Sequence, residues 1–179
     1  IGEGIGKGLH EAIELAEEGD WKGLIIGNNA KQFSVGANLM NIGMFAMQKQ
    51  FDVLERFVDD FQKINMKIRT SKIPVVVSTQ GYVFGGGCEI SMHCDAGIYA
   101  AESYIGLVEV GVGLLPGGGG TKEFALRASD DFFEGDVQNP TLINYFKSIA
   151  TAAVSTSAYE AYDLGYLKKE RDFVCVNTP

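Results

Sequence analysis

The chain has few of the residues that mark several classes of protein. Its 179 residues include three cysteines, four prolines and two histidines. Three cysteines without a CxxC pair do not make a disulfide framework, a zinc motif or a thioredoxin motif, which favours a reducing, intracellular setting. The sequence has no run of about 18 apolar residues and no basic region followed by an apolar stretch at its start. We therefore expect neither a membrane span nor a signal peptide.

Basic residues are also scarce. Lys and Arg number 15 against 23 Asp and Glu, which gives a net charge of −8. Nucleic-acid binding is disfavoured, because it needs a broad basic surface to neutralise phosphates. Hydrophobic residues make up 46% and charged residues 21%, as in soluble globular proteins. The length suits one domain with a sizeable core.

Glycine, in contrast, is abundant, with 23 of the 179 residues. Twelve of these glycines lie in the 48 residues from Ile73 to Gly120. The four charged residues of this block are all acidic: Glu89, Asp95, Glu102 and Glu109. Glycines within apolar strand and helix patterns permit close backbone approach or unusual φ and ψ angles. The backbone of this block is therefore a candidate working surface.

Hydrophobic periodicity predicts strands that alternate with helices, which is typical of an α/β protein with parallel strands. We expect helices at about 6–18, 44–70, 86–93, 122–128, 142–153 and 157–165. The 157–165 helix would be capped by Ser155 or Ser157 and stopped by Gly165. We expect buried strands at about 21–27, 73–79 and 96–101, and loops at about 32–41 and 129–140.

Two glycine runs, Gly85 to Gly87 and Gly117 to Gly120, precede predicted helices. A glycine-rich loop that opens a helix exposes N–H groups at the positive end of the helix dipole, where a phosphate or a developing oxyanion can bind. Neither a GxGxxG nor a Walker motif fits the sequence, which disfavours nucleotide phosphate. Oxyanion binding and tight helix–strand packing both remain open at this point.

Two glutamates of the block are candidates for proton transfer. Glu109 is the only charged residue between Glu102 and Lys122, and its apolar setting would raise the carboxyl pKa toward a useful range. The alternative is a buried ion pair with a distant Lys or Arg. Glu89 falls in the first turn of the helix after the triple glycine, where the helix dipole alone also favours a carboxylate.

His93, Cys94 and Asp95 are adjacent on one predicted helix turn and point in different directions, so a structural role is expected rather than a metal site. Cys88 as a nucleophile would need a base, and His93 is poorly placed for that task five positions later. The Met and Phe residues of the predicted 44–70 helix are interpreted as core or interface packing.

Several segments together resemble the crotonase (enoyl-CoA hydratase/isomerase) family. They are FSVGANL at 33–39, IPVVV at 73–77, GYVFGGGCE at 81–89, GLVEV at 106–110 and GLLPGGGGT at 113–121. The resemblance implies an α/β fold that is a spiral of repeated ββα units, N- and C-terminally truncated relative to the family. It implies one crotonase-like domain over residues 1–179, with a core of about 1–128 and a helical part of about 129–179, as a fragment of a larger protein.

The same resemblance implies roles for particular residues. Two backbone N–H groups of the family hold an acyl-CoA thioester carbonyl in an oxyanion hole, and the matching residues are Ala37 and Gly86. The catalytic glutamates match Glu89, which would activate water for the β-carbon, and Glu109, which would protonate the α-carbon. Further substrate-binding positions would be Gly36, Asn38, Gly85, Gly87, Pro116 and Gly117. Asn38 stands where the commonest family motif has Asp, which leaves the backbone donor intact.

The resemblance is greatest to the hydratase region of large bacterial 3-hydroxyacyl-CoA dehydrogenases. It implies hydration of 2-enoyl-CoA in cytoplasmic fatty-acid β-oxidation, with acyl-CoA as substrate and no metal. No cofactor is expected in these residues, since NAD would belong to the dehydrogenase part. Contacts with other copies or with dehydrogenase domains are expected. The alternatives are an isomerase or another CoA-thioester enzyme of the same fold, and a non-catalytic acyl-CoA-binding or oligomerisation module.

Overall fold

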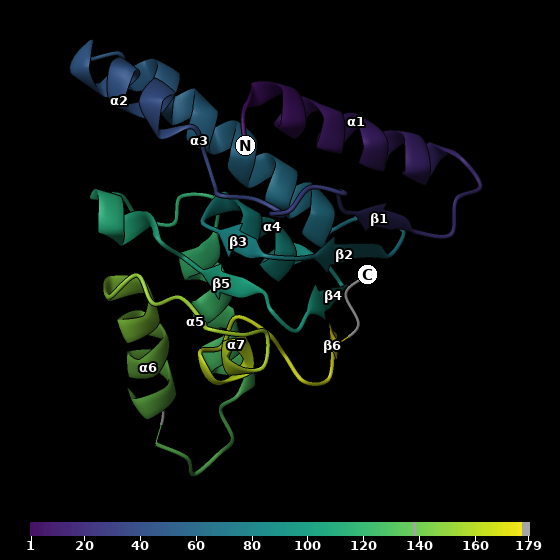
Figure 1. The fold of residues 1–179 in the computed structure, drawn as a ribbon, viewed down its shortest axis with the longest axis vertical. Helices are drawn as coiled ribbons and strands as arrows, with labels where there is room; N and C mark the ends of the chain where they lie inside the picture. Colours follow the sequence, from purple (N-terminus) through teal and green to yellow (C-terminus); the bar gives the residue numbers. More distant parts are fainter. Residues whose placement is uncertain (138, 177–179) are drawn as a thin grey trace.

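The chain winds into a spiral in which each turn adds strands to two parallel sheets (Figure 1). A computed structural model describes residues 1–137 and 139–176. The larger sheet has the strand order β1-β2-β4-β6: β1 (Leu24–Ile26), β2 (Val75–Thr79), β4 (Ala96–Ala100) and β6 (Asp172–Cys175). The smaller sheet pairs β3 (Tyr82–Phe84) with β5 (Tyr104–Gly106). The predicted α/β class with parallel strands is confirmed.

One helix precedes the first strand, and the others lie between or after strands in the chain. The helices are α1 (Glu3–Glu18), α2 (Leu39–Met47), α3 (Phe51–Arg69), α4 (Gly86–His93), α5 (Gly120–Asp130), α6 (Asn139–Ala150) and α7 (Glu160–Asp163), with a 3₁₀ turn η1 (Glu109–Val112). In the part of the chain that the structure describes, no helix is both long and apolar enough to span a membrane.

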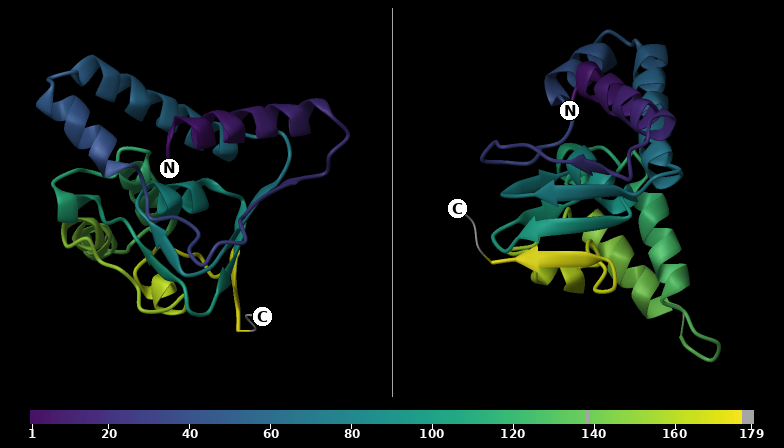
Figure 2. Two further views of the ribbon diagram at one scale, coloured as in Figure 1. Left: turned by 45° about the horizontal axis from the view of Figure 1, so that its top comes forward. Right: turned by 90° about the vertical axis from the view of Figure 1, so that its right-hand side faces the viewer.

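The spiral repeats a ββα unit. One turn runs through β2, β3 and α4, and the next runs through β4, β5 and, after η1, α5. The turns stack because β2 pairs with β4 and β3 pairs with β5 in parallel, as the stacked strands in Figure 2 show. Ser34 forms a parallel bridge to Val83 of β3. In the preceding turn of the spiral, Ser34 therefore occupies the position that corresponds to β3. This is the predicted spiral of ββα units.

Helix α4 lies at the centre of the molecule. All eight of its residues are buried, and its apolar side chains join a core with β2, β3, β5 and α5. The helix can approach the strand of the preceding turn because it begins with glycines. A Cβ added at Gly87 would lie 2.5 Å from Cβ of Ser34, so a larger residue would push the two turns apart.

The predicted single helix at 44–70 is wrong, since the structure has two helices there. Helix α2 begins at Leu39, inside the predicted 32–41 loop, after the Asn38 side chain accepts a hydrogen bond from the Met40 N–H at 3.1 Å. The chain then breaks at Lys49, whose φ is 57°. The apolar periodicity continues across the break because both helices turn apolar side chains toward one cavity.

Several predicted boundaries also change. Strand β1 is an edge strand rather than a buried one, with the Ile25 side chain 74% exposed. The short strands β3, β5 and β6 were not predicted. Helices α5 and α6 extend into the predicted 129–140 loop, of which residue 138 lies outside the described residues. Helix α7 is shorter than predicted. Ser157 Oγ nevertheless accepts from the Glu160 N–H at 3.2 Å, and Gly165 follows with a φ of 81°.

Candidate active site

The candidate site forms where three successive turns leave the smaller sheet at the same end. Ser34 pairs with Val83, and Val83 pairs with Ile105. Parallel strands in register carry the residues that follow them to neighbouring places. Ala37 lies three residues after Ser34, and Gly86 lies three residues after Val83. Glu109 lies four residues after Ile105. The pairing therefore brings together groups that are far apart in the sequence.

Two backbone N–H groups face this site. Gly86 is the first residue of α4, so its N–H has no acceptor within the helix and lies at the positive end of the helix dipole. The N–H of Ala37 makes no hydrogen bond within residues 1–137 and 139–176. The backbone of Gly36, with a φ of 90°, packs against Gly85 and Gly86. Ala37 and Gly86 thus offer two donors on adjacent turns.

Glu89 lies one helical turn after Gly86 and is 2% exposed. Its Oε1 accepts a hydrogen bond from the Gly120 N–H at 2.8 Å. Burial, together with the negative charge of Glu109, raises the pKa of Glu89 to about 7. The N–H groups of Gly118, Gly119 and Gly120 oppose this rise because they stabilise the carboxylate.

Glu109 begins η1 and is set in an apolar surrounding. Its Oε2 is buried without a hydrogen-bond partner in the described residues, and burial raises its pKa. The alternative of a buried ion pair is wrong, because no described Lys or Arg forms a salt bridge with Glu109. Gly85 leaves room for this carboxylate, since a Cβ added there would lie 3.0 Å from Glu109 Oε1.

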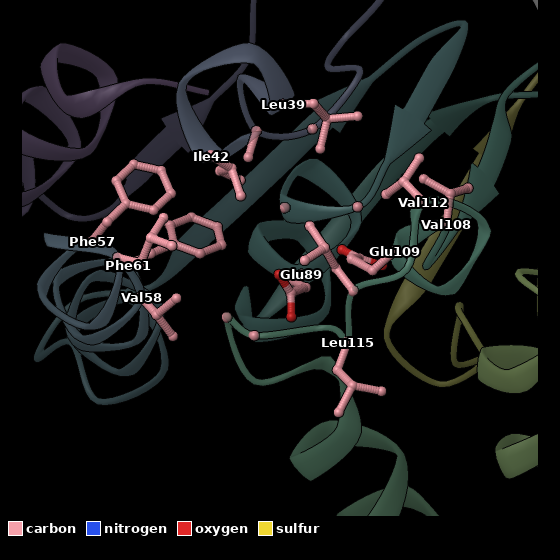
Figure 3. Close-up of a pocket in the computed structure, with 18 of the residues that line it drawn as sticks. Leu39, Ile42, Phe57, Val58, Phe61, Glu89, Val108, Glu109, Val112 and Leu115 are labelled. Atoms are coloured by element: carbon pink, nitrogen blue, oxygen red, sulfur yellow. The ribbon is translucent and has the colours of Figure 1, made fainter. Parts of the chain in front are cut away.

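Both carboxylates project into one apolar cavity of about 260 Å³ (Figure 3). Ala37, Gly86, Gly36, Gly85 and Gly117 also line this cavity. Its apolar walls come from α2, α3 and the segment around η1, and they include Leu39, Ile42, Leu54, Phe57, Val58, Phe61, Val108, Val112, Leu114 and Leu115. The cavity thus joins two proton-transfer groups, two N–H donors and a surface that fits a hydrocarbon chain.

Three of the predicted substrate-binding residues lie outside the cavity lining. The Asn38 side chain caps α2. Gly87 packs against Ser34, and Pro116 is buried against Gly120. The structure thus gives each of them a packing or capping contact, and a direct role in binding stays a prediction.

The apolar wall on α3 was not predicted from the sequence. Phe57 and Phe61 were interpreted as packing residues, whereas they line the cavity together with Val58. Their signal is present in the sequence as an apolar face on an otherwise polar helix, but the same pattern describes a helix packed on a core. Only the fold shows that this face borders a cavity.

The surroundings of His93 and Cys88 fit structural roles for both side chains. His93 Nδ1 lies 2.7 Å from the Glu89 carbonyl oxygen, and its Nε2 lies 2.8 Å from Lys122 Nζ. Burial lowers the pKa of His93 to about 4, so the ring is neutral, with its proton on Nδ1. Burial raises the pKa of the Cys88 thiol. Within the described residues, no group of three His, Cys, Asp or Glu side chains could hold a metal ion.

The turn beside Glu89 requires glycine, and Gly118→Ala tests this. A Cβ at Gly118 would lie 2.6 Å from Glu89 Oε2 and would overlap the Phe61 ring. We expect a loss of about 1–3 kcal/mol in the free energy of unfolding, measured by denaturant titration. Gly8→Ala is the control, since a Cβ there meets nothing within 4 Å on α1. It should stabilise the helix, and equal losses in both variants would contradict the steric explanation.

The fold is an α/β spiral. Its cavity brings together the carboxylates of Glu89 and Glu109 and the backbone N–H groups of Ala37 and Gly86. The family model described as Enoyl-CoA hydratase/isomerase matches residues 3–135. The chain therefore belongs to the enoyl-CoA hydratase/isomerase family.

Among relatives, the chain is 40% identical to a protein named "Probable 3-hydroxyacyl-CoA dehydrogenase" from Bacillus subtilis (strain 168), over 99% of this chain and 22% of that protein. It is 36% identical to the crotonyl-CoA hydratase of Syntrophomonas wolfei, over 55% of this chain and 36% of that protein. The chain thus spans well under half of either relative.

A solved enoyl-CoA hydratase from Polaromonas sp. JS666 matches with a TM-score of 0.78 at 20% identity. The match covers 96% of this chain and 61% of that structure. At this level of identity the match shows the fold alone, and it agrees with the spiral of ββα units.

Proposed function

We propose that this chain is the hydratase region of an enzyme that adds water across the 2,3 double bond of a 2-enoyl-CoA. The observation that carries the proposal is the cavity in which the carboxylates of Glu89 and Glu109 accompany the N–H groups of Ala37 and Gly86. Hydration of an enoyl thioester uses all four groups, because the reaction moves two protons and places negative charge on the thioester oxygen.

The reaction would proceed through an enolate. Glu89 takes a proton from water as the water oxygen bonds to the β-carbon, and the π electrons move to the thioester oxygen. The N–H groups of Ala37 and Gly86 stabilise that oxyanion, each by about 3 kcal/mol. Glu109 then gives a proton to the α-carbon as the carbonyl reforms. Water is consumed, and one hydroxyl and one hydrogen are gained by the acyl chain.

The surroundings of the two carboxyls suit these opposite roles. Glu89 has backbone N–H groups aimed at it, which favour its ionised form as a base. Glu109 has a buried oxygen without a partner in an apolar wall, which favours its neutral form as an acid. The charge of Glu109 is one of the causes that raise the pKa of Glu89, so the two carboxyls titrate as a coupled pair.

The name of the Bacillus subtilis relative supports a wider proposal. We propose that the intact protein also oxidises the 3-hydroxyacyl-CoA product with NAD, as part of fatty-acid β-oxidation in a bacterial cytoplasm. Hydration is redox-neutral and needs no cofactor, so NAD would serve only the second reaction. Contacts with dehydrogenase domains or with other copies would then surround this region.

The test is an assay of the intact protein with a 2-enoyl-CoA, followed by the loss of absorbance of the conjugated enoyl thioester. We expect hydration, and then NADH formation when NAD is added. Conversion of a 3-enoyl-CoA to its 2-enoyl isomer without hydration would indicate an isomerase. Binding of CoA thioesters, measured by calorimetry, without any turnover would indicate a non-catalytic module.

A further inference from the structure

The turn that faces Glu89 is also held from its opposite side. Gln62 Nε2 on α3 donates to the Gly117 carbonyl at 2.7 Å, and Asn65 Nδ2 donates to the Gly118 carbonyl at 2.8 Å. Gln62 and Asn65 are three residues apart, so they lie on the same face of α3. Neither amide was identified by the sequence analysis, and neither lines the cavity.

The geometry of the peptide bond connects these contacts to Glu89. In a planar trans peptide, the C=O of one residue and the N–H of the next point in opposite directions. The Gly117 carbonyl thus fixes the direction of the Gly118 N–H, and the Gly118 carbonyl fixes that of the Gly119 N–H. A Cβ added at Gly118 would lie 2.6 Å from Glu89 Oε2, and both N–H groups are among the causes that lower the pKa of Glu89.

The third peptide of the turn follows the same pattern without a side chain. The Gly119 carbonyl accepts from the Glu123 N–H at 2.9 Å, and the Gly120 N–H donates to Glu89 Oε1 at 2.8 Å. Gly119 has a φ of 111°, and the His93 ring packs beneath it. Three consecutive peptides are therefore anchored by their carbonyls next to one carboxylate, which accepts a hydrogen bond from the third of their N–H groups.

Asn65 is the more demanding of the two anchors. It is 0% exposed, and its Oδ1 has no hydrogen-bond partner in the described residues. A buried amide with an unsatisfied oxygen costs stability, which the hydrogen bond from its donor to the Gly118 carbonyl offsets only in part. Gln62, in contrast, lies on the surface, and its replacement should not disturb the core.

We propose that Asn65 and Gln62 are positioning residues for hydration, which orient the Gly117–Gly119 peptides so that their N–H groups hold the Glu89 carboxylate ready to activate water. The role in hydration rests on the proposed function, whereas the orientation of the carboxylate does not. The titratable groups around Glu89 are Glu109 on η1 and Cys88 on α4. His93 of α4 contacts the backbone carbonyl of Glu89 and not its carboxylate, and Lys122 and Glu123 of α5 lie on the other side of the His93 ring.

The experiment compares Asn65→Leu, Gln62→Leu and Gln62→Lys in the intact protein. Without the amides the N–H groups turn away from the carboxylate, so the pKa of Glu89 should rise above about 7. We expect the acid limb of the kcat profile to move up by about one pH unit in Asn65→Leu, with kcat at pH 7 about fivefold lower. KM should change little. Gln62→Leu should show a smaller shift, and Gln62→Lys, which keeps a donor, should restore it.

A second readout needs no activity. Infrared titration should show a protonated-carboxyl band that is absent in Glu89→Gln, and its midpoint should move up in the Asn65 and Gln62 variants. Gln50→Leu, an exposed residue before α3, is the matched control. A fully folded Asn65→Leu with unmoved midpoint and pH profile overturns the inference. If Asn65→Leu does not fold, Gln62→Leu decides it. Absence of hydration in the wild type overturns the proposed function alone.

Discussion

Replacing Glu89 with glutamine should lower kcat for hydration of a 2-enoyl-CoA by about 10³-fold or more, because an amide cannot accept a proton from water. KM should remain close to its original value, since the apolar walls and the two N–H donors are unchanged. The decrease in enoyl-thioester absorbance measures both constants. Residual turnover near the wild-type level would mean that water is activated by another group.

The same substitution should make the protein more stable at alkaline pH. The pKa of Glu89 in the folded protein is about 7, raised from 4.5, so the folded state binds the proton more tightly than the unfolded state. The contribution of Glu89 to stability is then greatest below pH 4.5 and is lost as the pH rises through about 7. Glutamine does not titrate, so Glu89→Gln should be more stable by roughly 2 kcal/mol at pH 8.

Unfolding transitions at pH 5 and pH 8 measure this effect. Glu55→Gln is the matched control, because it removes an exposed carboxylate of α3 that does not line the cavity. A stability gain that is equal in the two variants would show that overall charge, rather than the burial of Glu89, is responsible.

Replacing Glu109 with glutamine should also reduce hydration, by about 10² to 10⁴-fold, because no acid then delivers a proton to the α-carbon. The wild-type rate should fall on the alkaline side as Glu109, whose pKa is raised, loses its proton. That limb should vanish in the variant.

Assays at a series of pH values with a 2-enoyl-CoA and a 3-enoyl-CoA test both parts. Unchanged hydration in Glu109→Gln would reject the assignment of the acid. A chain that shifts the double bond of the 3-enoyl substrate equally well with and without Glu89, but needs Glu109, would act as an isomerase, because that reaction can use a single carboxyl.

The sequence predicted the parts of this site that are local. Helix α4 was expected at 86–93 and found at Gly86–His93, because three glycines and a first-turn carboxylate mark its start. The apolar setting of Glu109 was visible as well. The spatial arrangement of the site was not visible in the sequence, since it depends on the pairing of Ser34, Val83 and Ile105. Strands β3 and β5 have three residues each, which is too short for periodicity to detect, so only the family resemblance linked Ala37 to Gly86.

The contacts of α3 were beyond sequence reasoning for another reason. Phe61 and Asn65 lie within one amphipathic helix, and their spacing does not show which neighbour they face. Asn65 is a polar residue on a largely apolar face of α3. Such an exception to the apolar pattern could have indicated a buried amide.

The proposed oxyanion donors at Ala37 and Gly86 belong to the main chain, so side-chain mutagenesis does not reach them. Ala37 is already alanine, and Gly86→Ala would add a Cβ 3.0 Å from the Phe61 ring while it keeps the N–H. An alanine scan would thus assign the whole reaction to Glu89 and Glu109. Replacement of one peptide by an ester, through chemical synthesis of the segment, removes a single N–H and leaves every side chain in place. The ester substitution therefore tests the proposed role of the backbone separately from the roles of the two carboxylates.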